Sequence, residues 1–215
     1  MKIRAMKIWT LPLLALVAAC SQNSGNRAKA GNNAAAPADD SAAAAPAPAQ
    51  GAQQAGMPPG LDCVRNRLSP EQRREFAQLA MERGSRDDPR AQPVLQAVEA
   101  CGSELAWSPE KRQLASLFTM SAAGAAGIRE QLGAQGANFD ALDQAILSDR
   151  EFMAAAEAGQ LDGSVGQAFY QRHAALIQPM VGGEEEDPEL ATLIGNYIAF
   201  RALAETTAGK FGREP

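Results

Sequence analysis

Residues 108–132 read SPEKRQLASLFTMSAAGAAGIREQL, and this stretch decides the fold. Ser108 and Pro109 are residue types typical of a helix N-cap and of the first helical position. Beyond them, apolar or small residues recur every three or four positions, which is the spacing of one face of an α-helix. The stretch therefore predicts one long helix with a single buried stripe. The residues of that stripe are Leu114, Leu117, Phe118, Ser121, Ala125, Ile128 and Leu132.

The same start signal recurs on both sides of this helix. A capping residue followed by proline stands at Ser69-Pro70, at Asp88-Pro89, where Pro93 delays the helix by a turn, and at Asp187-Pro188. The last helix, expected over 188–211, is apolar around most of its circumference, which predicts a place at the centre. No stretch alternates with period two. The sequence therefore predicts an all-α domain, a compact bundle of six or seven short-to-medium helices.

Small side chains follow one side of the long helix at Ser121, Gly124 and Gly127. They allow another helix to approach closely, at a cost of about 1 kcal/mol per glycine in helix propensity. Two interpretations remain at this point. The small residues form either a tight crossing inside the bundle, or a binding groove or self-association face.

The first 19 residues have the pattern of an export signal. Lys2, Arg4 and Lys7 precede an apolar run over 8–17, and small residues follow it. That run is about half as long as the roughly 20 residues that a membrane-spanning helix needs. We therefore expect residues 1–19 to be a signal peptide.

The end of this segment, Val17-Ala-Ala-Cys20, resembles the lipobox of bacterial lipoproteins. The resemblance covers the export segment alone. It implies a lipid on the Cys20 thiol, cleavage before that residue and an acylated amino terminus, and two or three acyl chains anchor a protein stably. By the family's sorting rule, Ser21 after the cysteine implies the outer membrane, facing the periplasm. The competing interpretation is an ordinary secretory signal that ends at a chance cysteine.

Between the export segment and the helices the chain is low in large apolar residues. Residues 21–60 are mainly Ala, Pro, Gly, Asn and Gln, a composition that buries too little surface to fold. We expect residues 20–60 to be the lipidated cysteine and a disordered tether, with a reach of roughly 35 Å. Residues 61–215 then form one helical domain, long enough for a real core.

Two cysteines remain if Cys20 carries a lipid. Cys63 and Cys101 would lie in an oxidising compartment, where a pair of cysteines is first interpreted as a disulfide. A metal pair or a reactive thiol would need supporting ligands, and none is near in the sequence. We expect a structural disulfide.

The charge of the chain excludes one class of partner. The formal net charge is −5, and removal of Lys2, Arg4 and Lys7 with the signal lowers it to −8. An acidic domain without a basic stripe argues against nucleic acid and against docking on anionic lipid.

Five acidic residues gather over 184–189, without the alternating ligands and bend glycine of a calcium loop. We expect no metal and no cofactor.

One short motif is similar to a catalytic one. Ser108 and Lys111 fit the Ser-x-x-Lys of penicillin-binding proteins and serine β-lactamases. The partner motifs Ser-Asp-Asn and Lys-Thr-Gly are missing, and a role as N-cap accounts for Ser108. His173 is the only histidine, so the sequence gives little support to catalytic triads and argues against histidine metal clusters and His-Glu-x-x-His zinc sites.

Two residues are candidate ligand or partner contacts. Arg201 lies among apolar residues of the last helix, where its charge needs either a salt bridge or a bound anion. His173 lies at the edge of an apolar face, where it is either a half-buried packing residue or a pH-sensitive contact.

These observations favour a non-catalytic envelope lipoprotein. Its membrane contact would be the lipid on Cys20, and its domain would bind an envelope protein or serve envelope assembly or maintenance, because a tethered domain can search for partners. One alternative is a carrier or sensor of a small apolar ligand. Another is a cell-envelope hydrolase that uses carboxylates. The ligand alternative rests on adaptable core liners, Met81, Met120, Met153 and Met180.

Overall fold

The computed structural model describes residues 58–82, 84–133, 137–183 and 187–214, where helices are the only regular secondary structure. The all-α prediction is confirmed. The signal peptide, Cys20 and the tether as far as residue 57 lie outside the described residues, as does the acidic segment 184–186. The α-helices are α1 (Leu61–Arg67), α2 (Pro70–Met81), α3 (Gln92–Glu104), α4 (Pro109–Gly133), α5 (Phe139–Ser148), α6 (Arg150–Glu157), α7 (Gly163–Arg172), α8 (Ala174–Ile177) and α9 (Pro188–Arg213). Two 3₁₀ helices are η3 (Pro89–Ala91) and η4 (Gln178–Val181).

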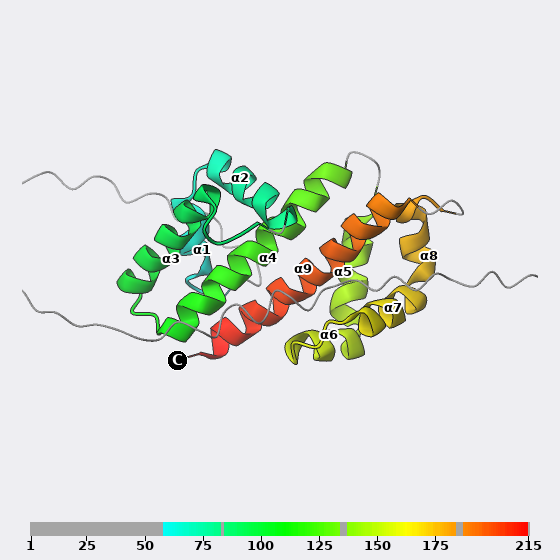
Figure 1. The fold of residues 1–215 in the computed structure, drawn as a ribbon. Helices are drawn as coiled ribbons and strands as arrows, with labels where there is room; N and C mark the ends of the chain where they lie inside the picture. The colour runs from blue at the N-terminus through cyan, green and yellow to red at the C-terminus, as the bar shows by residue number, and fades with distance from the viewer. Residues whose placement is uncertain (1–57, 83, 134–136, 184–186, 215) are drawn as a thin grey trace, which may run out of the picture.

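The two longest helices, α4 and α9, run antiparallel through the middle of the molecule (Figure 1). At one end, Trp107 just before α4 packs edge-on against Phe211 of α9, with ring centroids 5.1 Å apart. Lys111 Nζ donates a hydrogen bond of 2.8 Å to the carbonyl of Glu214 at the same end. The pair forms a shared spine, which confirms the central place predicted for the last helix.

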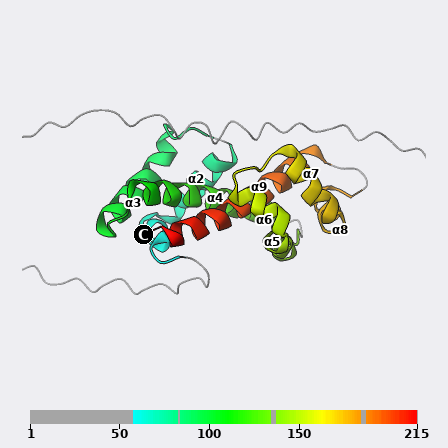
Figure 2. The same cartoon turned by 90° about the horizontal axis from the view of Figure 1, so that it is seen from below.

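The spine separates two cores. The helices α1–α3 gather at one end of the molecule and α5–α8 at the other, with α4 and α9 reaching both (Figure 2). We call the two clusters of buried apolar residues the N-terminal core and the C-terminal core. The N-terminal core is Leu61, Val64, Leu68, Phe76, Leu79, Ala91, Val94, Ala97, Val98, Cys101, Trp107, Ala115, Ala208 and Phe211. The C-terminal core is Ala125, Ile128, Leu132, Phe139, Leu142, Ala145, Ile146, Phe152, Ala156, Phe169, Ile177, Val181, Ile194, Tyr197, Ile198 and Ala202.

The helix starts follow the capping signals in the sequence. Ser69 forms a reciprocal capping box with Gln72, with hydrogen bonds of 3.1 and 2.9 Å. Asp88 caps η3, which runs into α3 at Gln92, so Pro93 lies within the first turn. Asp187 accepts from two backbone N–H groups of α9. These caps satisfy N–H groups that a helix end leaves without a partner.

The described residues contain more α-helices than the six or seven expected, and the additional ones are α1 and α8. Helix α1 has seven residues and no side-chain cap, so neither length nor end signals reveal it. It is held by burial of Leu61 and Val64. Helix α8 is separated from α7 at His173, whose backbone leaves the helical range at φ −114° and ψ 22°.

The small residues of α4 form close contacts inside the bundle. A Cβ at Gly124 would lie 2.7 Å from the ring of Phe200 on α9. A Cβ at Gly127 would lie 3.1 Å from Met81 and 3.2 Å from Ala77 of α2. These two glycines therefore belong to internal crossings of α4 with its neighbours, the first of the two interpretations.

Cys63 and Cys101 form the expected disulfide, with Cα atoms 6.1 Å apart. It joins α1 to α3, and Cys101 is fully buried in the N-terminal core. The first helix after the tether is thus covalently tied to the core. None of the helices in the described part is at once long and apolar enough to cross a membrane.

Candidate binding groove

A groove of about 600 Å³ lies between α2, α3 and the first half of α4. We call it the α2–α3–α4 groove. Most of its lining is apolar, and the residues from Gly84 to Arg86 form part of its rim. Its volume falls within the roughly 300–1,000 Å³ of sites that bind small molecules.

The floor of the groove is the N-terminal core itself. Phe76, Leu79, Val94 and Val98 all line it, and none of them is more than 7% exposed. Core side chains therefore face the groove with only a narrow strip of their surface. Leu95 of α3 is a more open wall residue.

One part of the lining depends on the crossing of α4 with α9. Phe200 is the only residue of α9 among those that line the groove in the described structure, and its ring lies on Gly124. Met120, one turn before Gly124 on α4, also faces this space. A flexible thioether and an aromatic ring together give a wall that can adapt to a bound chain.

An ion pair crosses the rim between α3 and α4. Arg112 Nη1 donates a hydrogen bond of 2.6 Å to Glu99 Oε2. The stem of Arg112 lies across Gly102, where a Cβ would come within 2.5 Å of Nε. That Nε is buried and has no hydrogen-bond partner among the described residues. The guanidinium is thus held at the rim with only part of its donor capacity used.

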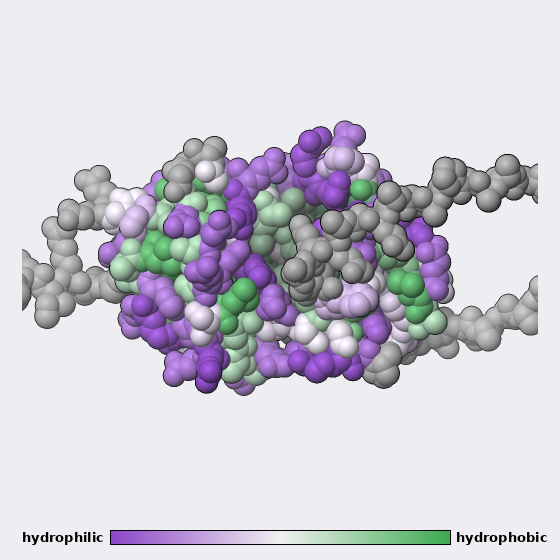
Figure 3. Space-filling model, turned by 180° about the vertical axis from the view of Figure 1, so that it is seen from behind, coloured by the Kyte–Doolittle hydropathy of each residue, from purple (hydrophilic) through white to green (hydrophobic). Residues whose placement is uncertain are grey.

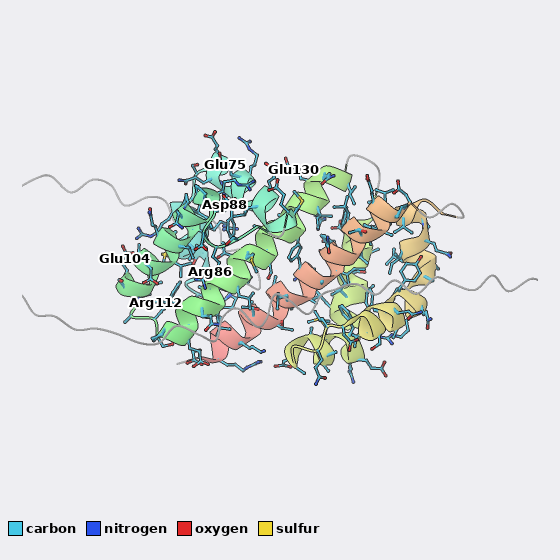
Figure 4. All side chains as sticks on the ribbon, in the orientation of Figure 1. Glu75, Arg86, Asp88, Glu104, Arg112 and Glu130 are labelled. Carbon is cyan, nitrogen blue, oxygen red and sulfur yellow. A yellow bond between two sulfur atoms is a disulfide. The ribbon has the colours of Figure 1, made fainter. Side chains whose placement is uncertain are left out.

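Arg86 is the second cation of the rim. Neither an ion pair nor a hydrogen bond of its guanidinium is found within the described part of the chain. Figure 4 labels Arg86 and Arg112 near one another, beside α3 and α4. The nearby carboxylates of Glu82 and Asp88 are both bound by Arg90, at 2.9 Å each. The hydrogen bonds from Arg90 lower the pKa of both carboxyl groups, so they stay charged and engaged with that arginine.

A second, smaller groove of about 370 Å³ lies between α1, α2 and α4. Its wall on α4 consists largely of small side chains such as Ala122, Ala123 and Ala126, and Arg73 and Arg74 stand at its rim. Small side chains offer little area to an apolar ligand.

Seen from behind, hydrophilic residues cover much of the molecule and separate smaller apolar patches (Figure 3).

Arg201 lies in a polar network of the C-terminal half. Its Nε is 3.4 Å from Asp143 Oδ1, and its Nη1 donates to Glu205 at 3.0 Å. Tyr197 also donates to Asp143 Oδ1, at 2.7 Å, and burial and this neighbour raise the pKa of Tyr197. Arg129 contacts the other oxygen of Asp143 at 3.3 Å. Of the two fates predicted for Arg201, the structure shows the salt bridge.

His173 lies far along the chain from the groove residues and packs on Phe169, with ring centroids 4.5 Å apart. Its Nε2 is 3.1 Å from Asp149 Oδ2. Asp149 also caps α6 and accepts two hydrogen bonds from Arg172, at 2.8 and 3.0 Å. Burial opposes ionisation of Asp149, but the hydrogen bonds from Arg172, Phe152 N and His173 outweigh it and lower its pKa. The structure therefore shows His173 as a half-buried packing residue with a carboxylate partner.

The remaining motif of the sequence is accounted for by local structure. Ser108 Oγ accepts from the backbone N–H of Lys111 at 3.0 Å, as an N-cap does. Lys111 Nζ points instead to the carbonyl of Glu214 and to the ring of Phe211. Within the described residues, no group of three or more His, Cys, Asp or Glu side chains is placed to hold a metal ion.

Comparison of the chain with protein-family models, curated proteins and solved structures gave no match.

Of the residues that line the groove, Met120 was named in the sequence as an adaptable liner of an apolar site. Arg86, Arg112 and Phe200 were not singled out, because the two arginines are among many and Phe200 meets the groove from another helix. Gly102 was a further available signal. A glycine within a helix often marks a close approach, and here it admits the side chain of Arg112.

Proposed function

We propose that this chain is an envelope lipoprotein, anchored to a membrane through a lipid on Cys20, whose helical domain binds a small apolar ligand without catalysis. The α2–α3–α4 groove is the observation that supports this ligand. It combines a volume typical of small-molecule sites, an apolar lining and a few charged groups at the rim.

The volume of the groove favours a small ligand over a protein helix. A helix with its side chains is about 10 Å across, so a space of about 600 Å³ would take only about five of its residues. Interaction with an envelope protein, which the sequence alone favoured, stays a prediction and is the main competing outcome.

The charged groups of the rim support binding rather than catalysis. The two cations of the rim, Arg86 and Arg112, are arginines, whose planar groups of N–H donors suit recognition of an anion. Glu99 is exposed and already paired with Arg112. A pair of carboxylates at hydrolytic spacing is not part of the lining.

The test uses the mature chain, residues 20–215, with Cys20→Ser so that no acyl anchor competes for the groove. Titration calorimetry with monododecanoylglycerol should show one site per chain. Leu95→Trp fills the groove and should weaken binding by roughly tenfold or more. The matched control is Leu147→Trp, since Leu147 is 42% exposed in the other half and should leave binding unchanged.

Absence of binding, or equal binding by both tryptophan variants, would contradict the proposed function. Crosslinking of the lipidated protein in cells supplies the competing outcome. A single envelope protein recovered in equal amount, and lost with Leu95→Trp, would show that a protein occupies this surface instead.

A further inference from the structure

The charges around the groove point to one class of ligand. This step rests on the proposed function and makes it more specific. We infer that the α2–α3–α4 groove takes a fatty acid, with its carboxylate beside Arg86 and Arg112 and its tail toward Met120 and Phe200.

The rim carries an excess of positive charge on a protein that is acidic overall. Its ionisable residues are Arg86, Arg112 and Glu99, and the whole chain has a net charge of −5. Arg112 is 32% exposed and pairs with Glu99, while Arg86 pairs with none of the described residues. Two acidic residues near Arg86 in the sequence, Glu82 and Asp88, are bound by Arg90. Asp87 accepts from the backbone and hydroxyl of Ser85.

Guanidinium groups suit a carboxylate head. The planar fork of arginine matches the two oxygens of a carboxylate and forms shorter, stronger hydrogen bonds than neutral donors do. Arg112 uses Nη1 for Glu99, and its Nε is buried against Gly102, so Nη2 is the donor that remains for a ligand. Arg86, which lines the same groove, can supply the second contact.

The groove also has a polarity along α4. Arg112 lies near the start of this helix, and Met120 lies eight residues further on, a rise of about 12 Å. Phe200 lies over Gly124, one further turn away. Arg112 toward one end of the groove and the apolar side chains of Met120 and Phe200 toward the other are the pattern that a single-chain amphiphile requires. The distance suits a chain of medium length.

Glu99 competes with the ligand in this arrangement. Its carboxylate already occupies one donor of Arg112, at 2.6 Å. A fatty acid carboxylate must share Arg112 with it, and like charges that lie close together repel. Removal of the Glu99 charge should therefore strengthen binding, whereas removal of the Arg86 charge should weaken it.

The experiment compares three ligands with the same tail on the Cys20→Ser mature chain. They are dodecanoate, monododecanoylglycerol and dodecyltrimethylammonium, which carry a negative, neutral and positive head. Titration calorimetry below their aggregation concentrations should rank dodecanoate first, by roughly tenfold over the neutral ligand.

Two pairs of variants test the named residues. Arg86→Gln should lower the affinity for dodecanoate by roughly tenfold, because one charged hydrogen bond is lost. The affinity for the neutral ligand should change by no more than about twofold. Glu99→Gln should strengthen dodecanoate binding by about threefold or more. The controls change the net charge equally but lie elsewhere: Arg150→Gln in α6 and Glu104→Gln near the end of α3 should change neither affinity. Thermal unfolding by circular dichroism checks that each variant folds.

The outcomes separate the inference from the proposed function. If all three ligands bind equally and Arg86→Gln has no effect, the assignment of a fatty acid is wrong, whereas the proposed apolar site is supported. If Arg150→Gln weakens dodecanoate as much as Arg86→Gln, the preference reflects overall charge and the assignment is overturned. If no ligand binds, both proposals fail.

Discussion

The two halves of this molecule are held together in different ways. The half that contains the N-terminal core has a disulfide between α1 and α3 and leaves a groove of about 600 Å³ beside its core. The half that contains the C-terminal core has no disulfide in the described residues, and two aspartates, Asp143 and Asp149, join its helices through hydrogen bonds. The disulfide fixes α1 on α3, and α3 forms one wall of the groove, so the covalent link stabilises that wall. The helices of the other half are joined by apolar packing and by polar contacts of buried carboxylates.

The largest expected effect comes from the disulfide. Replacement of both cysteines, Cys63→Ala with Cys101→Ala, removes closure of a loop whose ends are 38 residues apart. In the chain-entropy model this lowers the free energy of unfolding by about 4 kcal/mol. Urea unfolding measures the loss.

Amide hydrogen exchange then tests where the loss falls. Exchange should accelerate in α1 and α3 more than in α5–α8. Equal acceleration in both halves would contradict the division of the molecule at the spine, and an unchanged free energy of unfolding would contradict the role given to the disulfide.

The counterpart in the other half is Asp149→Ala. This change removes the cap of α6 and leaves Arg172 and His173 without their carboxylate, whose side chain is only 6% exposed. Loss of a cap and of a largely buried partner should destabilise the chain by about 3 kcal/mol. Urea unfolding measures it, with Asp162→Ala as the comparison, because Asp162 is also an N-cap but has no arginine partner in the structure described.

The same carboxylate gives the C-terminal half a dependence on acid. The pKa of Asp149 is lower in the folded protein than in the unfolded chain, so its stabilisation is present above the unfolded pKa of about 3.9. It is lost as the pH falls from there through the folded pKa. The loss of stability between neutral pH and pH 3 should be smaller in Asp149→Ala than in the wild type. An identical acid dependence would show that other carboxylates carry it.

A smaller effect is expected from Tyr197→Phe. The hydroxyl donates a hydrogen bond of 2.7 Å to Asp143. Its loss should lower the free energy of unfolding by about 1.5 kcal/mol, because Asp143 keeps its contacts with Arg129 and Arg201. Thermal unfolding measures this change. A cost above about 4 kcal/mol would mean that the buried ring, rather than the hydrogen bond, had been disturbed.

Gly124→Ala should have the smallest effect on stability and a distinct effect on binding. Its Cβ would lie 2.7 Å from the Phe200 ring, and alanine regains about 1 kcal/mol of helix propensity, so the net cost should be about 1 kcal/mol. The displaced ring should change the affinity for dodecanoate. Gly195→Ala is the control, because a Cβ there meets no atom within 4 Å. An unchanged affinity in Gly124→Ala would remove Phe200 from the site.

The sequence predicted local features of the fold well. The caps at Ser69, Asp88 and Asp187 and the long helix from Pro109 all depend on neighbouring residues, and each is present in the structure. Helix α1 was not predicted, because it has only seven residues and depends on tertiary contacts rather than on helix propensity. The disulfide was predictable because two cysteines allow a single pairing once Cys20 is set aside.

The candidate site was less predictable, because distant segments form it. The need of Arg201 for a partner followed from its apolar neighbours, but Asp143 lies 58 positions earlier in the chain, beyond any helical spacing. The groove arises where α2, α3 and α4 meet, with Phe200 from α9. The angle at which helices meet depends on side-chain packing across all of them, and no single stretch of sequence encodes it.

The most direct test of fatty acid binding in the groove is a crystal structure of the Cys20→Ser mature chain with 12-bromododecanoate. We expect an anomalous bromine peak in the α2–α3–α4 groove near Met120 and Phe200, with the carboxylate beside Arg86 and Arg112. A bromine peak elsewhere, or a ligand whose head lies at the Phe200 end, would contradict it.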